Sequence, residues 1–454
     1  MKLTVIGGGG VRSLFLAKSL SQRAKELGIT TLVFMDNDPK KLSIYGRMAK
    51  KAANLISPET GFILTTDAKE AVENADYVIT TIREGGDEMR VKDERLALSL
   101  GVLGQETTGA AGLSFAMRSV YALREYCELI KKYAKPWCKV FNFTNPAGVV
   151  SQTLRDMGYD FTYGICDAPS GMLRSFAKLY NADENDISGE IYGLNHLSFF
   201  TSIKLGGREI LPELIENDEA YGKTDMRYFE KAMLKEKGVI PNEYLYYFYY
   251  PERSLSNILG AEKTRGEQIM EINEKMTAEL SEIDIENDFD TALSIFEKWY
   301  GERENNYMAS ETGVKRKSKF RFDLYSKDSG GYAGVALKYI EIERSGRAGT
   351  MILCTENGGA IPTLRGSDIV EITCDITKDG ALPHRFIYAA DGELELIKQV
   401  KEYERLASKA IREKSIEAAI QALTVHPLVN SSKIAEKLTK EYLKLNKEYT
   451  YDWR

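Results

Sequence analysis

Two side chains of the kind that bind transition metals lie near the middle of this sequence. Cys166 is followed directly by Asp167 in the segment 164–169, and His196 ends the segment 193–196. A thiolate and an imidazole are both competent ligands for a divalent transition metal, and two protein ligands would leave coordination positions open for substrate oxygens. A cysteine at a strand end is also commonly a small buried hydrophobe. Spacing alone leaves both interpretations open.

A run of four glycines gives the strongest binding signal. Gly7, Gly8, Gly9 and Gly10 lie between a β-rich segment and a segment with helical periodicity. Glycines let the backbone turn sharply and approach a pyrophosphate, while the N-terminus of the following helix offers free N–H groups and the positive end of its dipole. Two registers of the dinucleotide-binding pattern fit. The register with Ser13 in third position fits better, because a small residue there permits close helix–strand packing.

Asp36 decides which dinucleotide is expected. It follows the second β-rich segment, 31–35, where an acidic side chain accepts hydrogen bonds from the ribose hydroxyls and repels a 2′-phosphate. A glycine turn without a ligand is the alternative. However, the strand before the loop, the helix after it and Asp36 together satisfy the context that the pattern needs. The sequence therefore predicts NAD binding by the N-terminal segment.

Arginines supply candidate contacts for an anion. Arg83, Arg90 and Arg95 follow the fourth β-rich segment, at the carboxyl edge where parallel sheets bind ligands, and Arg265 begins a helical segment. The planar guanidinium suits a phosphate or a carboxylate. The acidic residues between the first three arginines also fit a solvated helix face with i,i+4 pairs, so at most one or two of the three should face a ligand.

The elements that must position these residues alternate in the first part of the chain. β-rich and helical segments follow one another, which predicts a doubly wound, mostly parallel α/β sheet of the Rossmann type. The β-rich segments are 2–6, 31–35, 62–65, 77–81 and 138–143, and the helical ones are 14–27, 40–55, 68–74 and 113–133. We divide the chain into an NAD-binding domain, residues 1–163, and a closely packed α/β or α+β catalytic domain, residues 164–454, although the sheet is free to continue past Tyr163.

The second part of the chain changes character. Segments 273–303 and 394–446 are strongly helical, whereas 187–203 and 332–350 mix helical and β signals. Segment 323–331 follows the basic stretch 315–321 and ends in Ser329-Gly330-Gly331, which is typical of a surface loop. Its position predicts a loop that can move over a pocket.

Composition and charge narrow the function classes. The chain has 454 residues, of which 43% are hydrophobic and 28% charged, as in soluble globular proteins of two domains. Its net charge of -6 argues against nucleic acid as a partner. No stretch approaches the roughly 20 apolar residues that cross a bilayer, and the N-terminus carries no signal-peptide pattern, so no membrane partner is expected. Five scattered cysteines without a CxxC pattern favour a reducing, cytoplasmic location.

Several motifs, in this order, resemble one family along nearly the whole chain. The motifs are the glycine run 7–10, the arginine segment 83–95, Gly104-Gln105-Glu106-Thr107-Thr108-Gly109, Asn142-Phe143-Thr144-Asn145-Pro146-Ala147, Cys166-Asp167-Ala168-Pro169, Asn195-His196 and Pro241-Asn242-Glu243-Tyr244. With them the chain resembles the NAD- and divalent-metal-dependent glycoside hydrolases of family 4. NAD-dependent glycosidases are exceptions to hydrolysis by two carboxylates.

The resemblance implies a redox-assisted hydrolysis of a phosphorylated disaccharide or glucoside. NAD would take a hydride from sugar C3, the ketone would acidify the C2 proton, a base would remove that proton, and the aglycone would leave from C1. Water would then add and NADH would return the hydride, so NAD is regenerated in each turnover. Mn²⁺ or another divalent transition metal would stabilise the enolate-like charge as a Lewis acid. The family also suggests a homodimer or homotetramer.

The resemblance further implies a role for each matching residue. Cys166 and His196 would hold the metal, Tyr244 would be the base and Asp167 the general acid. Tyr244 would need nearby cationic charge to lower its pKa, and Asp167 would need a raised pKa to hold a proton near neutrality. Arg90, Asn145 and Arg265 match substrate-binding positions, and we assign Val11, Arg12, Thr80 and Asn145 to the cofactor site together with the four glycines and Asp36.

Several assignments stay open. The pair 166–167 resembles the α-selective branch, whereas 9–13 and 241–247 resemble 6-phospho-β-glucosidases. We favour the α-anomer because Asp167 matches the acid of the α branch. An unphosphorylated α-galactoside or a uronide are alternatives within the family. Outside it, the alternatives are an NAD-dependent 2-hydroxy-acid dehydrogenase, which lacks a convincing Asp–His pair after the nucleotide domain, and a non-catalytic NAD-binding module.

Overall fold

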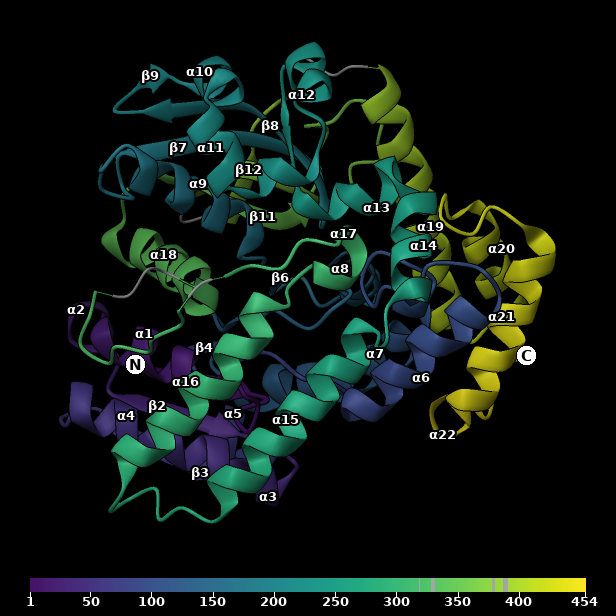
Figure 1. Ribbon diagram of the computed structural model, residues 1–454. Helices are drawn as coiled ribbons and strands as arrows, with labels where there is room; N and C mark the ends of the chain where they lie inside the picture. Colours follow the sequence, from purple (N-terminus) through teal and green to yellow (C-terminus); the bar gives the residue numbers. More distant parts are fainter. Residues whose placement is uncertain (318, 328–330, 378–379, 387–390) are drawn as a thin grey trace.

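One nine-stranded sheet runs through both halves of the molecule (Figure 1). The computed structural model describes residues 1–317, 319–327, 331–377, 380–386 and 391–454. The strand order is β13-β12-β11-β6-β5-β4-β1-β2-β3, so the parallel part has the order 3-2-1-4-5-6 of a dinucleotide-binding fold. The parallel strands are β1 Lys2–Ile6, β2 Thr31–Met35, β3 Gly61–Thr65, β4 Tyr77–Thr80, β5 Lys139–Asn142 and β6 Thr162–Gly164.

An antiparallel extension continues the sheet beyond these strands. It consists of β11 Gly349–Glu356, β12 Ile369–Thr377 and β13 Gly380–Pro383. Cys354 of β11 is paired with Gly164 of β6, and β6 itself crosses the expected boundary between residues 163 and 164. The predicted α/β fold with a doubly wound sheet is confirmed, and the sheet does continue past Tyr163. The division of the chain at that residue stays a prediction.

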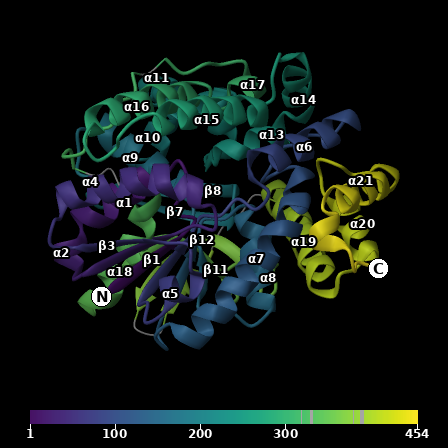
Figure 2. The ribbon, with the colours of Figure 1, turned by 90° about the horizontal axis from the view of Figure 1, so that it is seen from below.

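Helices cover both faces of the parallel strands (Figure 2). Helices α1 and α4 lie on one face, and α5, α7 and α8 lie on the other. This arrangement explains why all residues of β4 are buried, since a parallel strand between two helical layers has no solvent face. The helical elements up to β6 are α1 Ser13–Gln22, α2 Ala24–Leu27, α3 Pro39–Lys41, the π-helical η1 Leu42–Gly46, α4 Arg47–Ile56, α5 Ala68–Val72, α6 Gly86–Ser99, α7 Ala111–Tyr133 and α8 Ala147–Asp156.

A smaller antiparallel sheet packs against β12. Its strands are β7 Ile187–Leu194, β8 Leu197–Leu205, β9 Arg208–Glu209 and β10 Ile240–Pro241. The backbone N–H of Ile191 in β7 donates to Thr373 Oγ1 of β12 at 2.9 Å, which connects the two sheets. The mixed signals of segment 187–203 therefore correspond to a hairpin. Asn195 and His196 form its tight turn.

The remaining helices build two further layers. Helices α15 and α16 share one apolar cluster with α1 and α4, through residues such as Leu14, Met48, Met276 and Phe296. Helix α19 packs along α8. The elements are α9 Ala168–Leu179, α10 Leu211–Glu216, α11 Asp218–Lys223, η2 Asp225–Tyr228, α12 Lys231–Lys237, η3 Glu243–Leu245, α13 Tyr246–Tyr249, α14 Pro251–Gly260, α15 Arg265–Ser281, α16 Phe289–Asn305, α17 Ala309–Thr312, α18 Gly331–Ser345, α19 Asp391–Glu413, α20 Ile416–Val425, α21 Ser432–Leu445 and α22 Lys447–Thr450. None of the described helices is long and apolar enough to cross a membrane.

Helical periodicity in the sequence does not show where one helix ends and the next begins. Segment 394–446 divides at Lys414 and Asn430, whose φ angles are 54° and 43°. Ser415 and Ser431 then accept backbone N–H groups as N-caps of the next helices. Segment 332–350, with its mixed helical and β signals, consists of α18 followed by the start of β11.

The predicted loop 323–331 lies only partly within the described residues. Residues 318 and 328–330 lie outside them. The movement of this loop over a pocket stays a prediction.

Candidate active site

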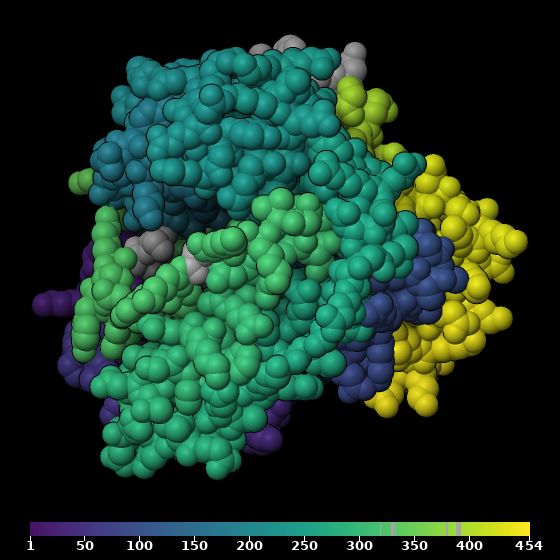
Figure 3. All heavy atoms as spheres, viewed as in Figure 1, coloured from purple at the N-terminus to yellow at the C-terminus, as the bar shows by residue number. Residues whose placement is uncertain are grey.

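A cavity of about 1280 Å³ lies beyond the carboxyl ends of the parallel strands, where doubly wound sheets bind ligands. Figure 3 shows the surface hollowed between the teal segments at the top and the green segments below them. The residues assigned to a catalytic, metal, cofactor or substrate role that line the cavity are Arg12, Arg90, Asn145, Cys166, Asp167, His196, Tyr244 and Arg265. Gly7, Gly8, Gly9, Gly10, Val11, Asp36 and Thr80 are not among its lining residues and lie on the adjoining strand ends and loop.

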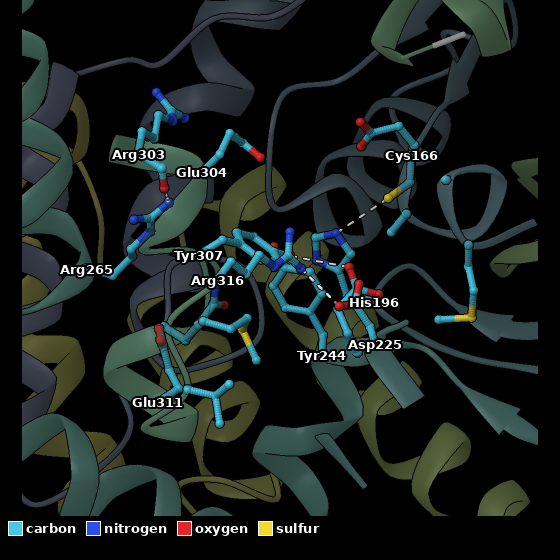
Figure 4. Close-up of a pocket in the computed structure, with 18 of the residues that line it drawn as sticks. Cys166, His196, Asp225, Tyr244, Arg265, Arg303, Glu304, Tyr307, Glu311 and Arg316 are labelled. Carbon is cyan, nitrogen blue, oxygen red and sulfur yellow. Dashed lines mark hydrogen bonds and ion pairs between the residues drawn. The ribbon is translucent and has the colours of Figure 1, made fainter. Parts of the chain in front are cut away.

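Cys166 and His196 meet in this cavity from two different sheets (Figure 4). Cys166 Sγ lies 3.6 Å from His196 Nε2. His196 has a positive φ of 63° in the turn between β7 and β8, and its Nδ1 lies 3.1 Å from Thr107 Oγ1. A partner on the second ring nitrogen is the usual way to orient a histidine ligand. The pair therefore fits a metal site with two protein ligands. The described residues contain no group of three His, Cys, Asp or Glu residues that fits a metal ion.

The protein environment keeps the imidazole of His196 neutral, as a metal ligand must be, but favours the protonated thiol of Cys166 over the thiolate that binds a metal. Burial lowers the pKa of His196 to about 4, so the ring is neutral near pH 7, as a ligand must be. Burial, followed by the negative charges of Glu371 and Asp167, raises the pKa of the Cys166 thiol well above its ordinary value. Only a cation close to the sulfur reverses that balance, because it stabilises the thiolate directly.

Tyr244 lies face to face with His196. The ring centroids are 3.9 Å apart and the planes differ by 6°. Burial and the neighbouring Glu243 raise the pKa of Tyr244, and a hydrogen bond with Tyr307 lowers it only in part. Tyr307 also donates to Glu243 Oε1 at 3.3 Å. The side chains around Tyr244 therefore do not make it a base by themselves, and a base role requires a cation beside it.

Asp167 stands at the first turn of α9 and lines the same cavity. Burial raises the pKa of its carboxyl group, while the positive charges of Arg12 and Arg174 lower it, and burial outweighs them. A raised pKa is what a carboxylic acid needs if it is to donate a proton near neutrality. The direction therefore agrees with the role that the sequence resemblance implies.

Arginines gather at the inner end of the cavity. Arg90 is buried and lies 2.9 Å from Glu94 and 3.3 Å from Glu106, so its charge is already paired. Arg265 donates from Nη2 to the carbonyl oxygen of Arg303 at 3.0 Å, but its buried Nη1 has no hydrogen-bond partner within the described part of the chain. Burial and the charges of Arg303 and Arg90 lower the pKa of Arg265 to about 10. Of Arg90 and Arg265, the two arginines assigned to substrate binding, Arg265 is thus the one with an unused donor.

The structure brings two of the three arginines after β4 to the cavity, and whether they face a ligand stays a prediction. Arg83 and Arg90 line the cavity, whereas Arg95 lies outside its lining. Arg95 instead pairs with Glu267 at 2.5 Å and is half exposed.

The glycine loop adopts the conformation that its residues predict. Gly7 has a φ of 97°. A Cβ on Gly8 would lie 2.6 Å from Phe34 Cβ, so this glycine permits the contact between the loop and β2. Ser13 Oγ donates to the carbonyl oxygen of Gly8 at 2.7 Å, which fits the register with Ser13 in third position. Gly9 N donates to Asp36 Oδ2 at 2.9 Å. The acidic side chain therefore lies at the loop, where a ribose would bind.

The structure does not test the other residues assigned to the cofactor site. Thr80 is buried, and its hydroxyl donates to Asn142 Oδ1 at 2.9 Å. Asn145 Oδ1 accepts from Ala147 N at 3.4 Å. Val11 packs beside the apolar cluster of α1, α4, α15 and α16. Their roles in cofactor binding stay predictions.

The sequence argument did not find two residues that line the cavity, nor a third that supports the turn carrying His196. Glu371 on β12 accepts hydrogen bonds from Asn195 Nδ2 at 3.1 Å and Ser198 Oγ at 2.8 Å, and it thereby supports the turn that carries His196. Tyr307 and Arg303 line the cavity from α16 and the chain after it. No local pattern in the sequence marks these three positions. Glu106, in contrast, lay inside a recognised motif, next to the arginines with which it pairs.

Comparison with known families accounts for both halves of this arrangement. Residues 2–182 match the model described as family 4 glycosyl hydrolase, and residues 191–429 match the family 4 glycosyl hydrolase C-terminal domain. The chain belongs to family 4 of the glycosyl hydrolases. The resemblance and the enzyme class inferred from the sequence are confirmed, and the dehydrogenase and the non-catalytic module are set aside.

Similar proteins carry both anomeric names. A probable 6-phospho-β-glucosidase of Bacillus subtilis is 28% identical, over 99% of this chain and 97% of its own. A phospho-α-glucosidase of Clostridium acetobutylicum is 28% identical, over 98% of each chain. The 6-phospho-β-glucosidase of Thermotoga maritima, solved with manganese, NAD⁺ and glucose-6-phosphate, superimposes with a TM-score of 0.81 at 26% identity over 99% of both chains.

Proposed function

We propose that this family 4 enzyme hydrolyses 6-phosphorylated glucosides with the help of NAD and a divalent cation such as Mn²⁺. The observation that supports this most directly is the meeting of Cys166, His196 and Tyr244 in one cavity. Sγ of Cys166 lies 3.6 Å from Nε2 of His196, and the ring of Tyr244 stacks on His196. The similar enzymes named above are 6-phospho- or phospho-glucosidases.

The donor set fits both cofactors. A thiol and a neutral imidazole suit a divalent transition metal. The glycine loop, the N-terminus of α1 and Asp36 would hold NAD. When bound, NAD accepts and returns the hydride of sugar C3, and the cation stabilises the negative charge that develops on the sugar.

Protein side chains move the protons. Tyr244 Oη removes the proton from sugar C2, and a cation held by Cys166 and the stacked His196 would offset its raised pKa. Asp167, whose pKa is also raised, donates a proton to the oxygen of the departing aglycone. The 6-phosphate binds beside Arg265 and Asn145, while Arg90 holds Glu94 and Glu106 in place. Because the acid in the matching position is Asp167, we favour the α-anomer.

Three further assignments belong to this proposal. Residues 1–163 form the NAD-binding domain and 164–454 the metal- and substrate-binding domain. The enzyme acts as a homodimer or homotetramer. It acts in the cytoplasm, where its five free cysteines stay reduced.

The test is hydrolysis of 4-nitrophenyl α- and β-6-phosphoglucosides by protein freed of NAD and metal. We expect activity only when NAD, Mn²⁺ and a reducing agent are restored, faster release from the α-anomer, and loss of a deuterium label from sugar C2 into water. Unphosphorylated glucosides should be much poorer substrates. Full activity of the stripped protein, or retention of the C2 label, would refute the proposal, and faster release from the β-anomer would refute the anomeric part alone.

A further inference from the structure

The outer rim of the cavity carries positive charge that the proposed reaction does not use. Arg174, Lys178, Lys315 and Lys317 all line it, and the three lysines are exposed. Within the part of the chain that the structure describes, none of the four pairs with a carboxylate. The protein as a whole has a net charge of -6. An unpaired cationic rim on an acidic protein points to an anionic ligand.

Two of the carboxylates that line the cavity are already held in ion pairs. Glu219 pairs with Lys223 at 2.5 Å. Asp225 pairs with Arg316 at 2.9 Å and lies 3.6 Å from Arg227 (Figure 4). These pairs engage two of the lining carboxylates, whereas Glu304, which also lines the cavity, acts on Asp167 and raises its pKa.

Helix α9 connects this rim with the proposed general acid. Asp167 is the N-cap of α9, and Gly171, Arg174 and Lys178 follow it at spacings of one, two and three turns, so that all four lie on the face that lines the cavity. With a rise of about 1.5 Å per residue, Arg174 and Lys178 lie roughly 10 and 16 Å along the axis from Asp167. A Cβ on Gly171 would meet Arg174 Nη2 at 3.6 Å, so the guanidinium reaches back toward the acid.

The position of the acid fixes the direction of the aglycone. The oxygen that leaves must lie within hydrogen-bond reach of Asp167. The sugar occupies the inner side, toward Arg265, because its phosphate needs a cation there. The group attached to the leaving oxygen therefore extends outward along the exposed face of α9, between Lys178 and the segment 315–317.

Resting on the proposed function, we propose that this rim is a subsite for an aglycone that carries a negative charge. Lysines act as point charges and accept a carboxylate or a phosphate alike, so the recognised property is the charge itself. The cations at the rim are largely exposed, and exposed ion pairs are individually weak. Together they should give a preference of about five- to tenfold in kcat/KM for an anionic over a neutral aglycone.

Three substrates with the same phosphorylated sugar test the subsite in the enzyme loaded with NAD and Mn²⁺. Their aglycones are 4-(carboxymethyl)phenol, 4-(phosphonomethyl)phenol and the neutral amide 4-(carbamoylmethyl)phenol. The methylene group keeps the acidity of the three phenols similar, so differences in rate report recognition rather than leaving-group chemistry. We expect both anionic substrates, or one of them, to exceed the amide. Equal kcat/KM for all three would overturn the proposal.

A charge variant separates recognition from general attraction of anions. The combined variant Lys178→Gln, Lys315→Gln and Lys317→Gln should lose the preference and keep kcat/KM for the amide. The control variant Lys433→Gln, Lys437→Gln and Lys440→Gln changes three exposed lysines of α21 outside the cavity and should keep the preference. An equal loss for all substrates would mean electrostatic steering alone and would overturn the subsite. Absence of NAD-dependent hydrolysis of every substrate would instead refute the proposed function.

Discussion

Replacing Arg265 by methionine should stabilise the protein while it impairs the enzyme. The guanidinium of Arg265 is held by one hydrogen bond, to the carbonyl oxygen of Arg303, and its Nη1 is buried without a partner within the described residues. Burial, with Arg303 and Arg90 nearby, lowers the pKa of Arg265 to about 10. The charged form of Arg265 therefore lowers the stability of the folded protein, and a bound anion would offset that cost.

The size of both effects follows from these contacts. A shift from 12.5 to about 10 corresponds to roughly 3 kcal/mol against the charged form. Methionine removes that penalty but leaves the carbonyl of Arg303 without its donor, which costs about 1 kcal/mol. We therefore expect Arg265→Met to raise the free energy of unfolding by about 2 kcal/mol. A charged hydrogen bond to phosphate contributes about 1.5–3 kcal/mol, so kcat/KM for a 6-phosphorylated substrate should fall roughly 10- to 150-fold.

Urea unfolding of the cofactor-free protein measures the first effect, and hydrolysis of phosphorylated and free 4-nitrophenyl glucosides measures the second. The matched control is Arg95→Met, because Arg95 is half exposed, pairs with Glu267 and lies outside the lining of the cavity. It should change the stability and the ratio of the two activities little. A loss of stability in Arg265→Met, or an unchanged preference for the phosphorylated substrate, would refute the reasoning.

Three further predictions test other parts of the molecule. Gly8→Ala brings a Cβ within 2.6 Å of Phe34 Cβ, so its free energy of unfolding in urea should fall by about 1–3 kcal/mol. Gly10→Ala, whose Cβ would have no neighbour nearer than 3.4 Å, should keep its stability and weaken NAD binding in calorimetry. Equal stability of the two variants would contradict the packing argument. Cys166→Ser should weaken Mn²⁺ binding at least about tenfold in titration calorimetry, and unchanged affinity would remove the sulfur from the site. His384 lies between two carboxylates, Glu190 and Asp375, which outweigh burial and raise its pKa. Its ion pairs therefore stabilise the fold fully below about pH 6.5 and less as the pH rises through the raised pKa. The loss of stability in His384→Gln should be larger at about pH 5.5 than at about pH 8.5, and the reverse order would contradict this assignment.

Local patterns were sufficient where function depends on consecutive residues. The glycine run, the small Ser13 and the acidic residue after β2 define the nucleotide loop, and the structure places Asp36 beside that loop, at hydrogen-bond distance from Gly9. Alternating β and helical segments likewise determine a doubly wound sheet, because parallel strands require a crossover after each one. Such features depend only on residues that are close together in the sequence, so the sequence alone determines them.

Contacts between distant segments were decided only by the tertiary structure. Cys166 and His196 are suggestive in the sequence, but their 3.6 Å approach depends on β6 and the β7–β8 turn packing side by side. Glu371, which supports that turn, comes from a strand far along the chain and has no local signature. The same holds for charge pairing. Arg90 and Arg265 look equivalent in the sequence, yet of these two described residues only Arg265 has a buried donor without a partner. Burial and the sum of nearby charges set these properties, and both arise only when remote segments fold against one another.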